Sequence, residues 1–381
     1  MSGIEDAPED LSERDEEGAG IAEPPPVVPP RENPLLLGHE AAESVLLNAY
    51  RSARLPHAWL LSGPRGIGKA TLAFRFARFL FAEGAAGPGL FAAPDASLAV
   101  APDHPVCRRV ASGGHADLLV VERGLDPKRK KLRSEIVVED TRAIAGFLRL
   151  TPAEGAWRVV IVDGADMMNP NAANALLKIL EEPPQKALLL LVSDNPGRLL
   201  PTIRSRCRIL ALKPLGEGEV TEALAHYRPD LAAGDRAILA QLAEGSIGRA
   251  IELAAAGGLG LYRSLVRLID GLPSLDGATL HALADRLARA DGEDSYRLLG
   301  ELLPGWIARM VALATGGGEG EHAALPGEAQ SMRRLAGRRG LDQWADVWEN
   351  LNQLFALADE VNLDRKQVVL NAFFALAEAA R

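Results

Sequence analysis

The segment GPRGIGKAT, residues 63–71, is the feature that most limits how this chain can fold. It follows the apolar run HAWLLSG and opens the helical pattern GKATLAFRFARFLFA. A glycine-rich turn between a buried strand and a helix lets backbone N–H groups point at phosphate oxygens, and a lysine adds a positive charge. Gly63, Gly66, Gly68 and Lys69 occupy these positions. The sequence therefore predicts a phosphate-binding loop within an α/β domain.

Further apolar runs alternate with helical patterns downstream of this loop. Strands are predicted at DLLVVE, WRVVIVDGAD, KALLLLVSDN and RCRILAL, and helices at 38–54, 140–150 and NPNAANALLKILEEPP. Such alternation is typical of a mainly parallel sheet that is covered by helices on both faces. Residues 84–116, rich in Gly, Ala, Pro and Asp, are predicted to be irregular. After Pro214 the strand-like runs stop, and Leu- and Ala-rich helical patterns follow.

Composition divides the chain into four segments. Residues 1–33 hold ten acids and two arginines, a net charge of −8, together with EPPPVVPP, and are predicted to be a disordered acidic tail. The other 348 residues carry only −1 of the chain's net charge of −9, so they lack the basic surface of a protein that binds nucleic acid by itself. We predict an α/β domain over 34–213, a small helical domain over 214–257 and a larger helical domain over 258–381.

The chain shows no sign of export or membrane insertion. No run approaches the roughly 18 apolar residues of a membrane span, and the acidic N-terminus resembles neither a secretory signal nor a transit peptide. Cys107 and Cys207 are predicted to be reduced thiols in a cytoplasmic protein. The basic run KRKK at 128–131 is interpreted as a solvated loop rather than a DNA contact, because aromatic partners are absent. Arg75 and Arg78 are predicted to face solvent.

Two positions depart from the pattern of an ATP-hydrolysing site. The residue after the loop lysine is normally Ser or Thr, whose hydroxyl holds Mg²⁺, but here it is Ala70, and Thr71 lies about 100° further round the helix. The strand-end motif VVIVDGAD supplies Asp163, but Gly164 stands where a water-activating glutamate is expected, and Asp166 would have to reach back. We therefore expect weak or metal-independent binding of ATP without efficient hydrolysis.

Four segments together carry a family resemblance: LPHAWLLSGPRGIGKATLA, VVIVDGADMMNPNAANALLKILEEPP, LLVSDNPGRLLPTIRSRC and GSIGRAIEL. Over residues 38–253 the sequence resembles the delta-prime subunits of the bacterial DNA polymerase III clamp loader, AAA+ proteins related to the ATP-hydrolysing gamma/tau subunit. The resemblance implies an AAA+ P-loop domain, a helical lid over 214–257 and a C-terminal helical collar over 258–381. It also implies gamma/tau and delta subunits as partners in a five-subunit ring, and the sliding clamp and primer-template DNA as partners of the complex.

The resemblance implies roles for single residues as well. Arg206, in the SRC triplet, matches the arginine that reaches the ATP of a neighbouring subunit. Ser193 and Asp194 match the sensor region at the end of the fourth strand, and Arg249 in GSIGR matches the sensor arginine of the lid. These three residues join the phosphate-loop residues and Asp163 as candidates for nucleotide contact.

An alternative for Arg206 is a local ion pair with an acid of the segment LEEPP. Arg204 and Arg208 are neighbouring candidates for the same role. If a strand starts here, its alternation places all three arginines on one face. The selection of Arg206 therefore depends on the motif match.

Zinc is not expected. Members of this family commonly carry a four-cysteine zinc module between the first and second strands, but this chain has HPVCRRVASGGH there. His104, Cys107 and His115 would supply three ligands at most, whereas structural zinc takes four.

Two other functions compete with that of a clamp-loader subunit. An autonomous AAA+ ATPase motor, of the gamma/tau or helicase-loader type, is disfavoured by Ala70 and Gly164. A pure adaptor that binds no nucleotide is disfavoured by the intact Gly63, Gly68 and Lys69. The sequence carries no polymerase chemistry of its own, so a nucleotidyltransferase activity would belong to the holoenzyme.

Overall fold

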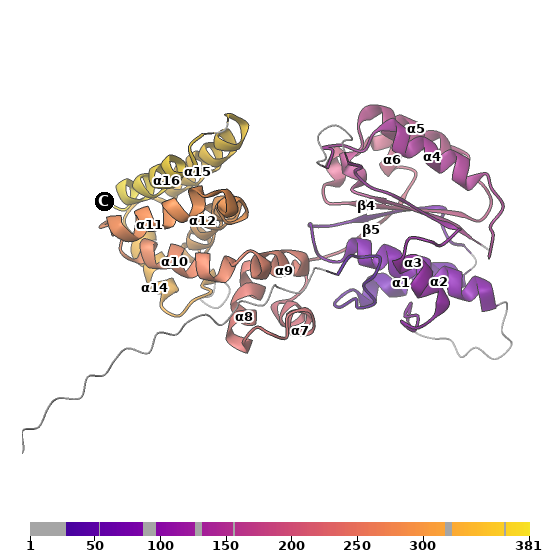
Figure 1. The fold of residues 1–381 in the computed structure, drawn as a ribbon, viewed down its shortest axis with the longest axis horizontal. Coiled ribbons are helices and arrows are strands. Elements are labelled where there is room, and N and C mark those ends of the chain that lie inside the picture. Colours follow the sequence, from indigo (N-terminus) through magenta and orange to yellow (C-terminus); the bar gives the residue numbers. More distant parts are fainter. Residues whose placement is uncertain are drawn as a thin grey trace, which may run out of the picture.

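The computed structural model shows an α/β lobe, built from the N-terminal half of the chain, beside a helical lobe built from the C-terminal half (Figure 1). It describes residues 28–52, 54–86, 97–125, 132–154, 157–316, 322–361 and 363–381. Most of the predicted acidic tail (1–27) and the basic run at 128–131 lie outside the described residues.

A five-stranded parallel sheet, in the order β2-β3-β4-β1-β5, forms the centre of the α/β lobe. The strands β1, β3 and β4 lie in the middle and are buried almost throughout, which explains why they read as continuous apolar runs. All of the predicted strands are confirmed. Their bounds are β1 (Ala58–Ser62), β2 (Leu118–Val121), β3 (Arg158–Asp163), β4 (Ala187–Ser193) and β5 (Arg208–Ala211).

Helices cover both faces of this sheet, and each face has its own hydrophobic core. One face carries α1 (Glu40–Arg51), α2 (Lys69–Ala86) and α3 (Pro105–Ala111). The other face carries α4 (Val138–Leu148), α5 (Pro170–Glu181) and the short α6 (Pro201–Arg204), and 3₁₀ turns occur at η1 (Ala165–Met167) and η2 (Pro196–Arg198). The predicted α/β P-loop fold is thereby confirmed.

One helix lies in a segment for which the sequence predicts irregular structure. α3 begins after His104, whose Nδ1 accepts a hydrogen bond from the backbone N–H of Val106 at 3.2 Å. Pro105 suits the first turn of a helix because its missing N–H would have no partner there. The prediction for 84–116 is therefore wrong over the seven residues of this helix and over the last three residues of α2.

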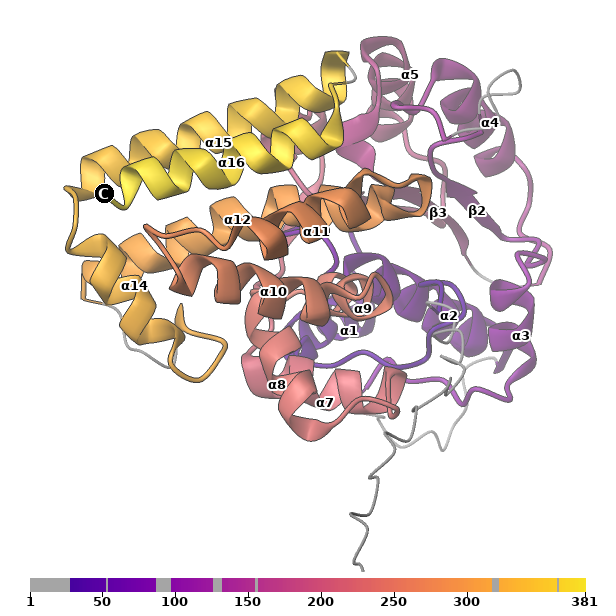
Figure 2. The ribbon, with the colours of Figure 1, turned by 60° about the vertical axis from the view of Figure 1, so that its left-hand side comes forward.

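Beyond β5 the described chain contains helices and no further strands, as predicted. The short helices α7 (Glu217–Tyr227), α8 (Ala233–Leu242) and α9 (Ile247–Ala255) form a group beside the α/β lobe. The remaining helices form a bundle that Figure 2 shows from another side. They are α10 (Gly258–Asp270), α11 (Gly277–Ala288), η3 (Ala290–Gly292), α12 (Glu293–Ala314), α14 (Glu328–Ala336), α15 (Leu341–Val361) and α16 (Arg365–Ala379). Within the described residues, no helix has the length and apolar character of a membrane span.

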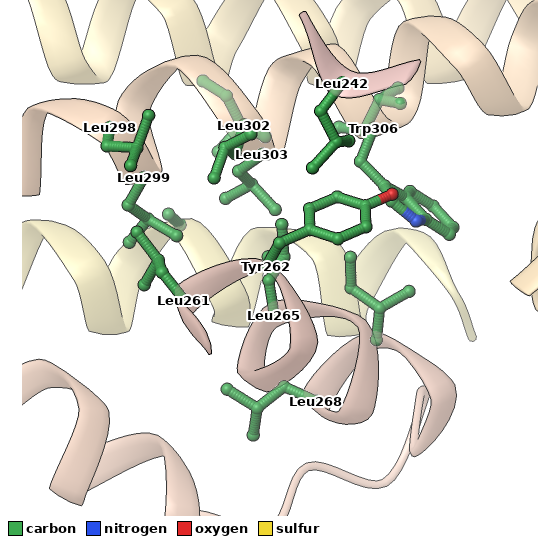
Figure 3. Packing of buried hydrophobic residues seen from close by; sticks show 14 of the residues in the cluster. Leu242, Leu261, Tyr262, Leu265, Leu268, Leu298, Leu299, Leu302, Leu303 and Trp306 are labelled. Carbon is green, nitrogen blue, oxygen red and sulfur yellow. The ribbon is translucent and has the colours of Figure 1, made fainter. Parts of the chain in front are cut away.

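A single hydrophobic core runs through the whole helical lobe. It includes Leu239 and Leu242 of α8, Tyr262 of α10, Trp306 of α12 and Phe373 of α16. Figure 3 shows part of it, with Leu242 close to the ring of Tyr262. The small helical group and the bundle therefore share buried surface. The domain boundaries predicted from the sequence remain predictions, and this shared core bears directly on the boundary at residue 257.

Arg75 and Arg78 do not face solvent, so that prediction is wrong. Arg78 is buried, and its guanidinium donates hydrogen bonds to the carbonyl oxygens of Arg31 at 3.0 Å and Asn33 at 2.7 Å. Arg75 donates to the carbonyl oxygen of Pro34 at 2.8 Å. The two arginines hold the segment that precedes α1 against α2.

Candidate nucleotide-binding site

The phosphate loop connects the carboxyl end of β1 to the first turn of α2. Gly66 and Gly68 have φ angles of 76° and 105°, in the region that favours glycine. A Cβ atom on Gly63 would lie 2.5 Å from the carbonyl oxygen of Leu212, just beyond β5. Glycine is thus required both for the turn of the loop and for its close approach to the backbone of Leu212.

The loop forms one wall of a cavity of about 650 Å³. Acidic residues from the strand ends face the loop, and apolar side chains from α9 and from the segment before α1 complete the lining. This combination suits a nucleotide, because phosphates need a polar end and a base needs an apolar one. The lining includes Gly66, Gly68, Lys69, Ala70, Thr71, Asp163, Asp166, Asp194, Leu36, Tyr227, Ile247 and Ile251.

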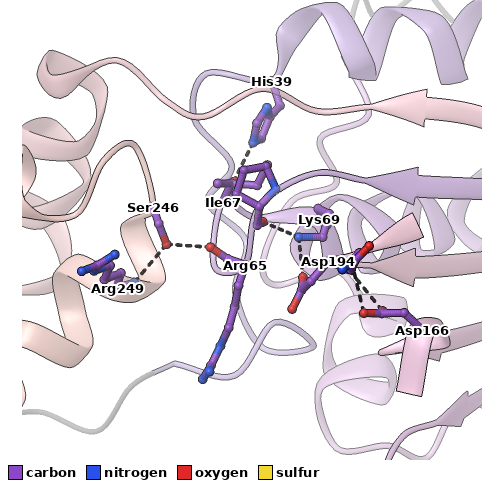
Figure 4. Close-up of polar contacts among 10 residues, drawn as sticks. His39, Arg65, Ile67, Lys69, Asp166, Asp194, Ser246 and Arg249 are labelled. Atoms are coloured by element: carbon purple, nitrogen blue, oxygen red, sulfur yellow. Dashed lines mark hydrogen bonds and ion pairs between the residues drawn. The ribbon is translucent and has the colours of Figure 1, made fainter. Parts of the chain in front are cut away.

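Lys69 is already paired within the protein. Its side chain is 3% exposed, and its Nζ lies 2.7 Å from Oδ1 of Asp194 and also donates to the carbonyl oxygen of Pro64. The carboxylate of Asp166 accepts hydrogen bonds from the backbone N–H groups of Asp194 and Asn195, both at 3.2 Å. Figure 4 shows these contacts as dashed lines. Asp166 therefore fixes the turn that carries Asp194.

Asp163 ends β3 in the wall of the cavity. Burial raises the pKa of its carboxyl group, and the nearby carboxylates of Glu122 and Asp194 raise it further, whereas Lys69 acts in the opposite direction. Gly164 follows in the left-handed conformation, with φ 78° and ψ 46°. A glutamate at position 164 would strain the backbone in this conformation. The turn after β3 is therefore not shaped for the water-activating residue that the sequence lacks.

The other predicted contacts at this end of the sheet differ in their placement. Ala70 and Thr71 both line the cavity, but the only hydroxyl of the pair comes one residue later than in a hydrolytic loop. Ser193 is fully buried at the end of β4 and is not part of the lining; its hydroxyl has no hydrogen-bond partner among the described residues.

The small helical group contacts the phosphate loop directly. The hydroxyl of Ser246 donates to the carbonyl oxygen of Arg65 at 2.8 Å, and the N–H of Gly248 donates to that of Gly66 at 2.9 Å. A Cβ atom on Gly248 would lie only 2.9 Å from Cα of Gly66. Gly248, the second glycine of GSIGR, thus allows two backbones to touch, a role that the sequence prediction missed although the pattern itself contains the signal.

Arg249 is not part of the cavity lining. Its guanidinium lies 4.0 Å from the carboxylate of Glu301 on α12, and in Figure 4 it lies on the far side of Ser246 from Lys69. Its backbone N–H donates to the hydroxyl of Ser246 at 3.1 Å. A nucleotide contact for Arg249 remains a prediction.

Arg206 also lies away from the cavity. It occupies the turn between α6 and the amino end of the edge strand β5, whereas the phosphate loop leaves the carboxyl end of β1, a parallel strand. Its guanidinium pairs with Glu181 at 2.8 Å and donates to the carbonyl oxygen of Thr202 at 3.0 Å. This is the local ion pair with LEEPP that the sequence left as an alternative. The Arg206 side chain is still 36% exposed.

The neighbouring arginines do not alternate as in a strand. Arg204 ends α6, Arg206 follows in a turn, and only Arg208 belongs to β5. The guanidinium of Arg208 lies 5.8 Å from the ring centre of Trp59. The expectation that all three share one face of a strand is therefore wrong, because the strand begins later than expected.

The residues weighed as zinc ligands have other surroundings. The ring of His115 stacks on Phe81 with a centre-to-centre distance of 3.9 Å, His104 caps α3, and Cys107 is a free thiol. Burial raises the pKa of the second free thiol, Cys207, to about 12. In the part of the chain that the structure describes, no group of three or more His, Cys, Asp or Glu side chains is placed to hold a metal ion.

The segment that contains the sheet and the phosphate loop is similar to known proteins. Residues 38–216 match the family described as DNA polymerase III, delta subunit. The delta-prime subunit of DNA polymerase III from Pseudomonas aeruginosa is 36% identical over 223 residues, which are 58% of this chain and 62% of that protein.

Two further relatives extend this result. The delta-prime subunit from Bacillus subtilis is 34% identical over 182 residues, 47% of this chain and 49% of that protein. The tau subunit from Escherichia coli is 32% identical over 273 residues, 70% of this chain and 39% of that protein. The matched region covers less than two thirds of each relative. The resemblance to delta-prime subunits and to their gamma/tau relatives is confirmed, and the delta-family segment holds Lys69, Asp194 and Arg206 but ends before Arg249.

Proposed function

We propose that this protein is a delta-prime-type subunit of the bacterial DNA polymerase III clamp loader and helps to place the sliding clamp on primed DNA in chromosome replication. The observation that carries the proposal is the delta-family match over 38–216, a segment whose phosphate loop is intact in outline but lacks hydrolytic residues. Gamma/tau and delta subunits would be its partners in a five-subunit ring. The clamp and primer-template DNA would be reached through that complex.

The cavity suits weak binding of ATP or ADP. The N–H groups of the loop and the ammonium group of Lys69 would hold phosphates, and the apolar side chains of Ile247 and Ile251 would cover the base. The residues present do not fit a firmly held Mg²⁺, because Ala70 has no hydroxyl for the metal ion. They do not fit hydrolysis either, because Gly164 stands where a glutamate would activate water. The chain's own contribution to ATP hydrolysis would then be Arg206, delivered to the ATP site of a neighbouring subunit.

The isolated full-length chain should bind ADP or ATP weakly and show no steady-state ATP hydrolysis above background. The loop retains its phosphate-binding backbone, but the groups that hold Mg²⁺ and activate water are missing. Nucleotide titration and a phosphate-release assay, each with and without Mg²⁺, measure the two properties. Robust Mg²⁺-dependent turnover that Lys69→Ala abolishes would contradict the prediction.

The main alternative is an autonomous ATPase motor of the gamma/tau or helicase-loader type. The 32% identity to the tau subunit of Escherichia coli favours it. Ala70 and the left-handed Gly164 disfavour it, since each removes one group that hydrolysis requires. The same turnover assay separates the two functions.

The chain should co-purify with gamma/tau and delta subunits when the three are expressed together. The bundle offers a surface for such contacts, because Trp348 and Leu357 of α15 and Phe374 of α16 are 43%, 49% and 53% exposed. Trp348→Glu should weaken assembly, measured by size-exclusion chromatography of the mixture. Leu150→Glu, at an exposed leucine of the α/β lobe, is the matched control and should assemble normally. A chain that elutes alone from the mixture would contradict the proposed function.

A further inference from the structure

The lysine of the phosphate loop has an anion beside it before any ligand binds. Lys69 is almost fully buried, and its Nζ contacts Oδ1 of Asp194 at 2.7 Å and the carbonyl oxygen of Pro64. A buried ammonium group without such partners would be costly. The cation that would bind phosphate oxygens is therefore satisfied by the protein itself.

Asp194 is held in place from both sides. The carboxylate of Asp166 accepts the backbone N–H groups of Asp194 and Asn195, and the side chain of Asn195 accepts the N–H of Gly197 at 3.2 Å. The Asp194 side chain is 45% exposed and lines the cavity. Its carboxylate is thus aimed at Lys69 from a fixed turn, in a position where a ligand can reach it.

Four carboxylates line the cavity around Lys69, those of Glu122, Asp163, Asp166 and Asp194, and the guanidinium groups of Arg65 and Arg123 line it as well. Phosphates that bind Lys69 would have to replace Asp194 and then lie beside the displaced carboxylate. Like charges that lie side by side repel one another strongly when they are partly removed from water.

We propose that Asp194 acts as a built-in anion that occupies Lys69 and thereby limits how tightly the cavity binds the phosphates of a nucleotide. This inference rests on the proposed nucleotide cavity and assigns the residue that sets its affinity. Asp194→Asn keeps the size of the side chain and an oxygen for Lys69 but removes the competing charge. Asp194→Ser removes the carboxylate by a different change and serves as a second variant.

The test is calorimetric titration of the full-length chain with ADP in the absence of Mg²⁺. We expect Asp194→Asn and Asp194→Ser to bind ADP about tenfold more tightly than the parent, since one charge-assisted contact no longer has to be broken. In a Lys69→Ala background, the Asp194→Asn substitution should give little gain, because the contested cation is gone. Glu182→Gln removes an exposed carboxylate that lies outside the cavity lining and is the matched control; it should give little gain as well.

Equal ADP affinities for the parent and both Asp194 variants would overturn the inference while leaving nucleotide binding in place. A gain of the same size in Glu182→Gln, or in the Lys69→Ala background, would also overturn it, because the effect would then be one of general charge. Binding by Asp194→Asn but not by the parent would support the inference and contradict nucleotide binding by the natural chain. Absence of binding in every folded variant, checked by thermal melting, would contradict both.

Discussion

A clamp loader reconstituted with Arg206→Ala should assemble normally but lose about tenfold or more of its DNA- and clamp-stimulated ATP hydrolysis. Arg206 lies at the amino end of the edge strand β5, whereas the chain's own cavity lies at the carboxyl ends of the strands. An arginine from a neighbouring subunit stabilises the charge on a transferring γ-phosphoryl group, and such residues contribute roughly 10³–10⁵ in turnover. The expected loss is smaller because a loader with several sites keeps the others.

Glu181 provides the control that separates this role from a purely local one. In the free chain Arg206 pairs with Glu181 at 2.8 Å, and both side chains are partly exposed. Exposed pairs of this kind contribute about 0–1 kcal/mol, so a competing γ-phosphate can replace the carboxylate. Glu181→Gln breaks the pair but keeps the guanidinium, and it should retain stimulated hydrolysis.

Two outcomes would show that Arg206 does not act on the ATP of a neighbouring subunit. One is that Arg206→Ala assembles and hydrolyses ATP like the parent complex. The other is that Glu181→Gln and Arg206→Ala lose the same activity, which would mean that the local ion pair is what matters. Arg208→Ala, which removes an exposed cation from the same edge, should behave like the parent.

The sheet could be predicted from the sequence because the physics that forms it is local. β1, β3 and β4 are buried on both faces, so each reads as one apolar run, and the glycine spacing of residues 63–68 fixes the turn that follows β1. α3 was missed because seven residues are too few to show a helical period, and its start depends on His104 and Pro105.

The contacts within the site could be predicted only in part. Lys69 and Asp194 each follow a strand end, but they meet because β1 pairs with β4, with Ser62 opposite Ser193. The order of strands in a sheet is not written in their order along the chain. Arg78 was misplaced for a similar reason, since its carbonyl partners precede α1 by sequence but lie against α2 in the fold. The pair between Arg206 and Glu181 was within reach of sequence reasoning, because an acid of the segment LEEPP was the local partner that the sequence offered for Arg206.

Removing residues 258–381 should leave the α/β lobe folded, prevent incorporation into the clamp loader and loosen α7, α8 and α9. The first two effects follow from the separate cores of the sheet and from the exposed apolar side chains of α15 and α16. The third follows from the shared core, since α8 and α9 both pack on α10. Leu239, Leu242 and Leu253 are fully buried there, and exposing each would cost about 1.5–3 kcal/mol.

Hydrogen exchange on the full chain and on chains that end at residues 213 and 257 would measure these effects. The sheet should stay protected in all three, whereas 217–255 should exchange rapidly in the chain that ends at residue 257.

Trp306→Ala in the full chain tests the same core without truncation. It should lower the free energy of unfolding by about 3–5 kcal/mol, with loss of protection in α8 as well as in α12. The contacts of Ser246 and Gly248 with the phosphate loop oppose this loosening, but these two hydrogen bonds contribute only about 1 kcal/mol each. If 217–255 remains protected without the bundle, the boundary at residue 257 separates two independent domains, and if the shortened chain still co-elutes with the other subunits, the bundle is not what holds it in the ring.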